Sequence, residues 1–586
     1  MSVEQLITAH LDIWTAADTE KKSGRGRSSG SAGSVYGVKK LRELILELAV
    51  RGKLVPQDES DEPASELLKR IAAEKAKLIA EGKIKKSKPL AEITDDEKPF
   101  ELPTGWEYAK LGEITNFGIT EKLGFISDET WVLDLEDIEK DTSRLLNKKS
   151  FCDRRSLSDK NSFQEGDVLY GKLRPYLNKV IVADESGVCT TEIFPIRCYG
   201  SFSSHYFKYA LKSPYFINYV NARSYGTKMP RLGTEDGRKA NFPLPPLAEQ
   251  HRIVTKVDQL MALCDQLEYQ HNNAAEAHDK LVTHLLGTLT QPQSTNTDSP
   301  LCKRGAGGDF NWQRISEHFD TLFTTEASID ALKQTLLQLA VMGKLVPQDP
   351  NDEPASELLK RILKERDRQI DQEGSKTIAS DKINESEMYI TTPDSWVYCR
   401  LGNIARFIDY RGKTPSKISS GVPLITAKNV RFGYISREPE EHVSPAEYES
   451  WMTRGFPRVG DMLFTTEAPL GNIAIINIAE KFALAQRVIC FKLHDQAIGA
   501  YLKIAIMSDQ VQQQLINAAT GMTATGIKAS KLKEIPVPIP TLAEQHRIVA
   551  KVDELMVICD QLKAGITSGN QLQQKIADVL VEQTTA

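Results

Sequence analysis

Two stretches of the chain, near residues 260 and 555, carry apolar side chains at alternating steps of four and three residues. The first seam consists of Ile253, Val257, Leu260, Cys264 and Leu267, and the second of Ile548, Val552, Leu555, Cys559 and Leu562. A sustained step of about 3.5 residues keeps one stripe of a helix apolar, so that the stripe packs against another helix. Prolines directly before each stretch prevent helix there, and the pattern therefore predicts long helices over 247–290 and 542–586.

The two predicted helices are nearly the same sequence written twice. LAEQHRIVTKVDQLMALCDQL at 247–267 and LAEQHRIVAKVDELMVICDQL at 542–562 are identical at 17 of 21 positions. Matching helices in one chain pack most simply on each other, which predicts a long antiparallel two-helix coiled coil. Packing of each helix onto its own separate domain would produce the same apolar seam and is the alternative.

These helices belong to a duplication of the whole chain. LAVRGKLVPQDESDEPASELLKRI at 48–71 and LAVMGKLVPQDPNDEPASELLKRI at 339–362 are identical at 21 of 24 positions, and each predicts helix, turn, helix. The first copy alone carries a Gly/Ser-rich insertion at 21–37, and a polar stretch at 291–310 joins the two copies. Both compositions are typical of flexible linkers.

Between the shared segments the two copies diverge. Short β-like runs alternate with helical runs in both divergent regions, so we predict an α+β fold with two α/β domains, separated by the coiled coil, in a tandem duplication of pseudo-twofold symmetry. The predicted order is a helical arm at 1–100, a divergent domain at 101–246, a long helix at 247–290, a linker at 291–310, a second arm at 311–392, a second divergent domain at 393–541 and a long helix at 542–586. The frame is duplicated, whereas its contents differ.

Polar and basic loops in the divergent domains are candidates for contacts with nucleic acid. The chain has a net charge of −5, but residues 172–239 hold eleven Lys or Arg against five Asp or Glu. Local positive charge of this kind can contact phosphates and base edges, although any single surface cation is more often only solvated. The candidates are Lys172, Arg174, Lys228, Arg231, Arg411, Lys413, Lys428, Arg431, Lys528 and Lys531.

The composition is typical of a soluble protein, and we expect a cytoplasmic location. Hydrophobic residues make up 40% of the chain and charged residues 26%, and no apolar run reaches the length of a membrane span. Eight cysteines occur without a CxxC pair, and Cys264 and Cys559 hold matching positions in the repeated helices. This usage indicates buried thiols in a reducing compartment rather than disulfides or a zinc site.

Motifs for catalysis and cofactor binding are missing from the sequence. The triplet Gly412-Lys413-Thr414 is not a P-loop, because Phe407 stands where that motif requires its first glycine. HExxH, GxSxG and a GxGxxG after a strand are also missing. We therefore predict no catalytic residue, no metal ligand and no cofactor in this chain.

A proline-rich motif before each long helix carries a family resemblance. It reads PLPPLAEQHRIV at 243–254 and PVPIPTLAEQHRIV at 536–549. Two divergent domains that each lead into this motif resemble the specificity subunits of Type I restriction–modification enzymes, and the resemblance covers essentially the whole chain. The KLVPQD…DEPASELLKRI segments resemble the longer-armed, IB-like branch of that family, from whose symmetry the insertion at 21–37 departs.

The resemblance implies a non-catalytic subunit for DNA recognition and assembly. Each divergent domain would be a target recognition domain that reads one half of a split, asymmetric site in double-stranded DNA, and the helix pair would set the spacer between the halves. Two methyltransferase subunits would dock on the repeated segments, and two restriction subunits would join them. S-adenosylmethionine, ATP and Mg²⁺ would serve those partners, and no membrane is involved.

Two other readings of the sequence remain open. A fused methyltransferase or nuclease with its own recognition domain would bind S-adenosylmethionine or cut DNA unaided, and the missing cofactor loop counts against it. A coiled-coil scaffold without a role in nucleic-acid binding would explain the helices but not the basic loops.

Overall fold

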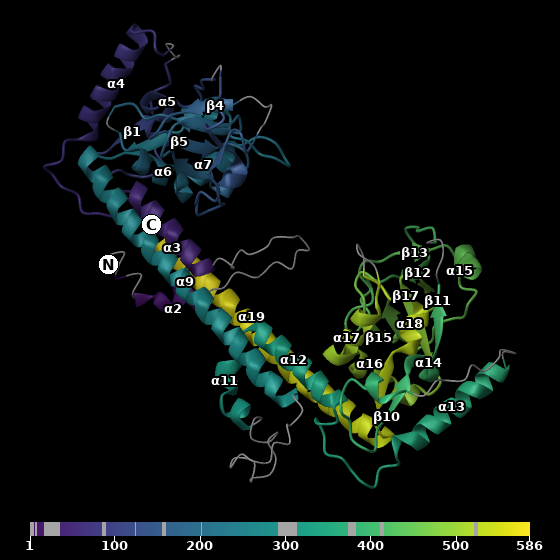
Figure 1. Ribbon diagram of the computed structural model, residues 1–586. Helices are drawn as coiled ribbons and strands as arrows, with labels where there is room; N and C mark the ends of the chain where they lie inside the picture. The colour runs from purple at the N-terminus through teal and green to yellow at the C-terminus, as the bar shows by residue number, and fades with distance from the viewer. Residues whose placement is uncertain are drawn as a thin grey trace. The chain divides into compact units, whose positions relative to one another are not determined.

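The computed structural model of the chain describes residues 5, 9–16, 35–84, 89–122, 125–154, 160–200, 202–290, 313–372, 383–410, 415–520 and 525–585. The residue contacts divide it into two units, one formed by 1–274 with 569–586 and the other by 275–568. Each unit contains one arm, one divergent domain and part of both long helices (Figure 1). The predicted linker at 291–310 lies outside the described residues.

The arm of the first unit consists of α2 (Leu11–Ala16), α3 (Tyr36–Val50) and α4 (Ala64–Ala80). Tyr36 and Gly37, which the sequence assigned to the flexible insertion at 21–37, lie in α3 instead; residues 17–34 are outside the described part. A Cβ atom at Gly37 would come within 2.4 Å of the Trp14 carbonyl oxygen. This glycine therefore lets two helices approach closely and does not loosen a linker.

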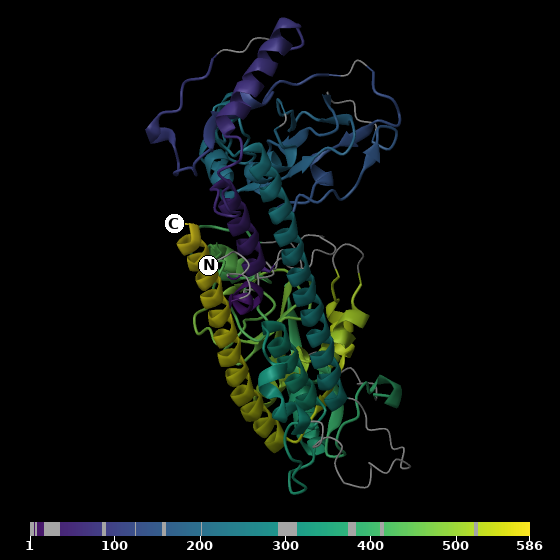
Figure 2. The ribbon, with the colours of Figure 1, turned by 90° about the vertical axis from the view of Figure 1, so that its left-hand side faces the viewer.

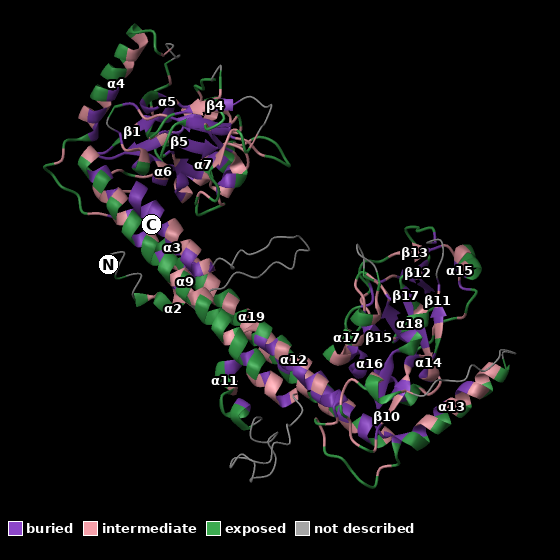
Figure 3. Ribbon diagram, viewed as in Figure 1, coloured by how far each residue is buried: buried purple, intermediate pink, exposed green. Residues whose placement is uncertain are grey.

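The first divergent domain has three small sheets. β1 pairs antiparallel with β9, β2 pairs parallel with β7 and antiparallel with β3, and β5 pairs antiparallel with β6 and β8. The strands are β1 (Glu107–Lys110), β2 (Trp131–Leu133), β3 (Lys149–Ser150), β4 (Lys160–Phe163), β5 (Val168–Gly171), β6 (Val180–Val182), β7 (Gly187–Thr190), β8 (Ile193–Ile196) and β9 (Asn241–Leu244). The helices are α5 (Leu111–Ile114), α6 (Ser204–Lys212), α7 (Pro214–Arg223) and α8 (Thr234–Arg238). All residues of β5 (Figure 3) and of β8 are buried, in keeping with their apolar sequences.

The second unit contains the arm helices α11 (Phe319–Leu322), α12 (Glu326–Val341) and α13 (Ala355–Gln372). The strands of its divergent domain are β10 (Val397–Arg400), β11 (Ala405–Asp409), β12 (Val422–Ile425), β13 (His442–Val443), β14 (Met462–Thr465), β15 (Ile473–Ile475), β16 (Ala483–Leu484), β17 (Val488–Leu493) and β18 (Pro536–Ile539). Its helices are α14 (Leu401–Ile404), α15 (Pro445–Trp451), α16 (Gly499–Met507), α17 (Asp509–Ala518) and α18 (Ala529–Glu534).

The duplication extends into the divergent domains. In the second domain β10 pairs antiparallel with β18, β12 pairs parallel with β16 and antiparallel with β13, and β14 pairs antiparallel with β15 and β17. These five pairings recur in both domains, whereas the antiparallel pairing of β4 with β7 is found only in the described part of the first domain and that of β11 with β17 only in the described part of the second. The predicted α+β class and the tandem duplication are confirmed, and the duplication reaches regions where the two sequences align at only a few points.

The long helices are α9 (Leu247–Thr290) and α19 (Leu542–Thr585), each of 44 residues. At 1.5 Å per residue each helix is about 66 Å long. In the first unit, Ile253, Val257 and Leu260 of α9 share a hydrophobic cluster with Ala577 and, partly buried, Leu580 of α19. The start of one helix thus meets the end of the other, which makes the contact antiparallel.

A third helix, α3, completes the helical core of the first unit. Arg42 of α3 donates hydrogen bonds to Asp265 and Glu268 of α9, at 2.7 and 2.8 Å. Tyr36 Oη donates to Asp578 of α19 at 2.7 Å. Figure 2 shows α3 in purple beside the teal α9 and the yellow end of α19.

The second unit repeats this arrangement with α12. Leu332 and Leu336 of α12 cluster with Val282 and Leu286 of α9 and with Cys559 of α19. Ion pairs join Lys333 to Asp560, and Asp330 to Lys563 at 2.7 Å. The predicted two-helix packing therefore omitted one partner in each unit, because an arm helix covers part of the same seam.

The predicted seam residues all lie in hydrophobic clusters. Ile253, Val257, Leu260 and Cys264 are buried, and Leu267 packs against the same cluster. Ile548 and Val552 are buried against α12 and α16, and Cys559, with Leu555 and Leu562 partly buried, belongs to the cluster around α12.

The described cysteines carry free thiols. Cys264 and Cys559 are buried, as predicted from their place on the seam, and burial raises the pKa of the Cys264 thiol to about 12. None of the described helices combines the length and the apolar character that a membrane crossing needs.

Replacing Ile253 with alanine should destabilise the first unit, because the side chain is fully buried between α9 and its neighbours. The expected loss is about 2–5 kcal/mol in the free energy of unfolding. Leu263→Ala is the matched control, since Leu263 is 45% exposed on the same helix, and it should change that free energy by less than about 0.5 kcal/mol. Urea unfolding followed by far-UV circular dichroism measures both; equal losses would contradict the packing.

Candidate nucleic-acid interface

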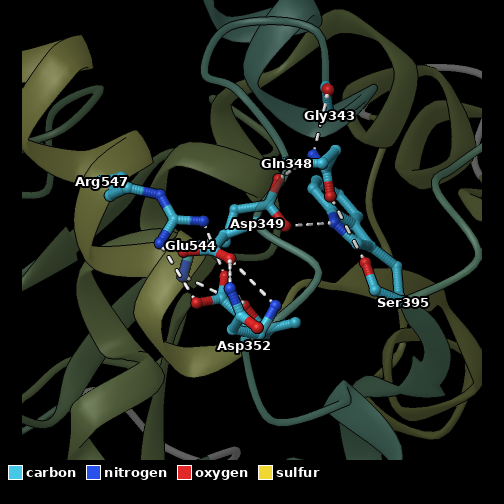
Figure 4. Close-up of polar contacts among 10 residues, drawn as sticks. Gly343, Gln348, Asp349, Asp352, Ser395, Glu544 and Arg547 are labelled. Carbon is cyan, nitrogen blue, oxygen red and sulfur yellow. Dashed lines mark hydrogen bonds and ion pairs between the residues drawn. The ribbon is translucent and has the colours of Figure 1, made fainter.

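A buried carboxylate at the start of each long helix holds the divergent domain and the arm together. In the second unit, Glu544 of α19 accepts a hydrogen bond from Trp396 Nε1 at 2.8 Å and another from Gln348 (Figure 4). Gln348 also donates to the Gly343 carbonyl oxygen at 3.3 Å. Arm, domain and helix therefore meet at one residue, and we call this set of contacts the helix-start clamp.

The first unit has the same clamp. Glu249 of α9 accepts hydrogen bonds from Trp106 Nε1 at 2.8 Å and from Gln57 Nε2 at 2.7 Å. Burial raises the pKa of both glutamates, and the tryptophan and glutamine donors act in the opposite direction. A buried carboxylate with two donors fixes geometry well, because losing either donor leaves an acceptor without a partner.

An ion pair next to each clamp ties the arm loop to the same helix. Arg547 contacts Asp352 at 2.7 Å in the second unit, and Arg252 contacts Asp61 at 2.6 Å in the first. The Thr541 hydroxyl donates to Asp352 at 3.0 Å. These are the shared residues of the AEQHR and VPQDxxDEP segments, so their identity in both copies has a direct structural cause.

Two of the basic loops predicted for the first domain lie against each other. The loop between β5 and β6, residues 172–178, is joined to residues 225–232 by backbone hydrogen bonds. Leu232 N donates to Lys172 O at 3.1 Å, and Arg174 N donates to Pro230 O at 2.7 Å. Tyr225 and Arg231 exchange bonds of 2.9 and 3.1 Å. We call residues 172–178 and 225–232 the first paired loops.

The second domain builds the same pair of loops. Ile527 N donates to Thr466 O at 3.0 Å, and Thr520 and Gly526 exchange bonds of 2.9 and 3.1 Å. The second paired loops are residues 466–471 and 520–527, of which 521–524 lie outside the described residues. The bond from Lys172 N to Glu192 O, 3.0 Å, has its counterpart from Thr466 N to Arg487 O, 3.1 Å.

Both pairs of loops contain a left-handed residue before a proline. Arg174 has φ of 51° and Ala468 has φ of 47°. Side chains other than glycine rarely take this conformation, and it costs on the order of 1–3 kcal/mol. Equivalent hydrogen bonds surround this residue in both copies although the side chains differ, and the following peptide bond is cis at Ala468-Pro469 and trans at Arg174-Pro175.

A buried lysine, Lys212, supports the first paired loops through hydrogen bonds inside the domain. Lys212 Nζ donates to the carbonyl oxygens of Asp141 and Thr142 at 2.9 and 3.0 Å and to Ser143 Oγ at 2.7 Å. Ser143 Oγ in turn donates to the Asn178 carbonyl oxygen at 2.7 Å. Burial lowers the pKa of Lys212 to about 7.

The structure places the predicted basic residues in three settings. Lys172, Arg174, Lys228 and Arg231 belong to the first paired loops, where Lys172 Nζ lies 5.0 Å from the Phe194 ring and Arg231 pairs with Glu192 at 3.0 Å. Lys428, Arg431, Lys528 and Lys531 are exposed, and Lys531 pairs with Glu534 at 2.9 Å. Arg411 and Lys413 lie outside the described residues.

Several residues at this site escaped the sequence reasoning. Tyr176 and Tyr225 are 47% and 60% exposed on the first paired loops. In the second domain Glu467 pairs with Arg487 at 2.6 Å, and Asn472 Nδ2 donates at 2.9 Å to the carbonyl oxygen of Val430, the residue before Arg431. No local pattern marks Lys212, because its three acceptors lie about seventy residues earlier.

Comparison with known proteins places both copies in one family. The family described as Type I restriction modification DNA specificity domain matches residues 103–277 and 393–569. Each matched range begins just before the clamp tryptophan and ends beyond the clamp glutamate of its unit.

Similar proteins from Escherichia coli include two that align with nearly the whole chain. The Type I restriction enzyme EcoAI specificity subunit is 40% identical over 616 aligned residues, which cover 99% of this chain and 99% of that protein. The EcoEI specificity subunit is 38% identical, again over 99% of both chains. The EcoDI specificity subunit is 27% identical over 44% of this chain and 54% of its own length.

The first domain should become more stable as the pH rises from about 7 toward 10, because Lys212 holds its proton less tightly when folded than when unfolded. In that range the unfolded chain binds the additional proton, so deprotonation favours the folded state. Lys212→Met should flatten this dependence, whereas Lys77→Met, at an exposed position, should keep it. Urea midpoints measured at several pH values give the comparison, and parallel profiles for K212M and the unmodified chain would refute it.

Proposed function

Because this chain belongs to the specificity subunits of Type I restriction enzymes, with two target recognition domains, we propose that each of these domains reads one half of a bipartite, asymmetric DNA site. The proposal rests on the contrast between the repeated scaffold of the two copies and the different side chains that the two scaffolds carry. The clamp, the arm and most of the strand pairing repeat in both copies, whereas the side chains on the paired loops differ. Two equivalent scaffolds that carry different DNA-facing side chains suit a site whose two halves have different base sequences.

The long helices would set the length of the spacer between the two half-sites. Support comes from the contacts inside each unit, where the start of one long helix packs with the end of the other. A helix of about 66 Å is on the scale of two turns of DNA, at about 34 Å for each turn. Removing whole heptads from a helix would then change the preferred spacer.

The chemistry would come from partner subunits. We propose that this chain is non-catalytic, that two methyltransferase subunits and two restriction subunits assemble on it, and that S-adenosylmethionine, ATP and Mg²⁺ serve those partners. The relatives over the full length are themselves specificity subunits of restriction enzymes, which supports this division of labour.

The repeated arms are the proposed docking sites for the two identical methyltransferase subunits. Residues that stabilise the fold explain only part of their identity. Exposed side chains are identical as well, namely Lys53, Asp58, Glu62, Lys69 and Arg70 in the first arm and Lys344, Asp349, Glu353, Lys360 and Arg361 in the second. Identical exposed surfaces in one chain suit one kind of partner bound twice.

Arg70→Glu and Arg361→Glu should each remove one methyltransferase subunit from the assembled complex. Both arginines are about half exposed and pair only with surface glutamates, so the fold should tolerate the change. A reversed charge in a complementary interface costs several kcal/mol, so binding at that arm should weaken more than tenfold. Native mass measurement counts the bound subunits. Lys77→Glu, at an exposed position that is not identical between the arms, is the control and should retain both.

Exchanging residues 101–246 for the corresponding domain of the EcoAI relative should change only one half of the methylated site. Methylation mapping of genomic DNA from cells that carry the complete system reads both halves in one experiment. The reciprocal exchange of 393–541 should change only the other half. A chimera that alters both halves would show that the domains do not read DNA independently.

A further inference from the structure

The paired loops of the two domains form one backbone frame with interchangeable side chains. Equivalent hydrogen bonds identify equivalent positions, because Lys172 and Thr466 occupy the same place in the network, and so do Glu192 and Arg487. The left-handed residues Arg174 and Ala468 mark another such place, and the loop partners Arg231 and Gly526 a further one. The correspondence rests on geometry, since the two sequences here show little likeness.

Side chains at the equivalent positions differ in charge and in reach. Lys172, Leu173, Arg174, Glu192 and Arg231 in the first domain stand where Thr466, Glu467, Ala468, Arg487 and Gly526 stand in the second. Each frame holds one ion pair, but from different places. Glu192 pairs with Arg231 at 3.0 Å, whereas Arg487, at the place of Glu192, pairs with Glu467 at 2.6 Å. Equivalent backbone hydrogen bonds therefore present different side-chain donors and acceptors.

The chemistry of these side chains suits the edges of bases. Arginine and lysine donate to the acceptors of guanine, glutamate accepts from cytosine, and threonine does either. Arg174 Nε is buried and has no hydrogen-bond partner among the described residues, while the side chain as a whole is only half-buried. The backbone at Arg174 remains left-handed at an energetic cost, which is typical of a residue held in position for a ligand.

Exposed tyrosines flank the same positions in the first domain. Tyr176 and Tyr225 come from the two different loops and are about half exposed, which gives apolar surface beside the charged groups. Lys212 and Ser143 hold the loop at Asn178 from the protein side. The paired loops thus combine rigid support, positive charge and aromatic surface.

We propose that the five equivalent positions, 172, 173, 174, 192 and 231 in the first domain and 466, 467, 468, 487 and 526 in the second, determine which bases each half-site contains. This inference rests on the proposed function of the two domains and assigns their specificity to named residues. Within it, Arg174 is a base-contacting residue, and the frame makes side chains transferable between the two domains.

Arg174→Ala tests the assignment in the complex reconstituted with the methyltransferase subunits of its own system. The substrate is a pool of DNA duplexes in which both half-sites are randomised, and sequencing of the methylated products gives the preference at each base pair. The variant should lose about 5- to 150-fold of the preference at one base pair of one half-site, which corresponds to one arginine–guanine contact. Arg144→Ala, an exposed arginine of the same domain outside the frame, should keep every preference.

A variant with five substitutions extends the test to all five equivalent positions. The variant K172T/L173E/R174A/E192R/R231G places the side chains of the second frame on the first and should replace the preference of the first half-site while the second stays unchanged. Uniform loss of methylation at all sequences in the R174A variant would overturn the assignment, because it indicates a phosphate contact alone. An unchanged preference would overturn it too. If far-UV circular dichroism shows that the variant with five substitutions does not fold, the result for R174A alone tests the assignment.

The unmodified complex separates this inference from the function on which it rests. If it methylates no bipartite site, the proposed function fails. If it methylates a bipartite site and the R174A variant retains the full preference in both halves, only the assignment to the paired loops fails.

Discussion

Each helical core of this protein is completed by the end of a long helix that begins in the other copy. Residues 569–585 of α19 belong to the first unit, and residues 275–290 of α9 belong to the second. Burial of apolar surface is the main driving force of such packing. Duplication within one chain therefore has a structural consequence, because each repeat supplies the last turns of its neighbour's core.

The buried glutamate at the start of each long helix links this helical core to the divergent domain. Glu249 and Glu544 each bind a tryptophan from the domain and a glutamine from the arm, and their burial makes the geometry costly to change. Because these contacts fix the position of the divergent domain on the long helix, the rest of the domain sequence can differ between the copies. Most of the strand pairing and the equivalent hydrogen bonds of the paired loops recur in both copies, while the side chains carried by the loops differ.

The sequence predicted well what depends on repetition and periodicity. The bounds of the long helices agree with the predicted ones within a residue, because prolines define their starts and the apolar seam defines their course. It predicted the insertion less well, since Gly37 is read from composition as flexible and serves instead for close approach to Trp14. The third helix in each core was missed because an apolar seam shows that a helix packs against another element but does not identify that element.

The sequence by itself determined the duplication, the paired helices, the basic loops and the resemblance to a family, because these are properties of order and spacing along the chain. Only the tertiary structure decided that residues 172–178 meet 225–232, that Arg174 and Ala468 are equivalent, and that Lys212 supports their loop. These relations depend on backbone hydrogen bonds between segments distant in sequence. Such bonds join peptide groups that every residue carries, so different side chains can share one frame and leave no common letters to align.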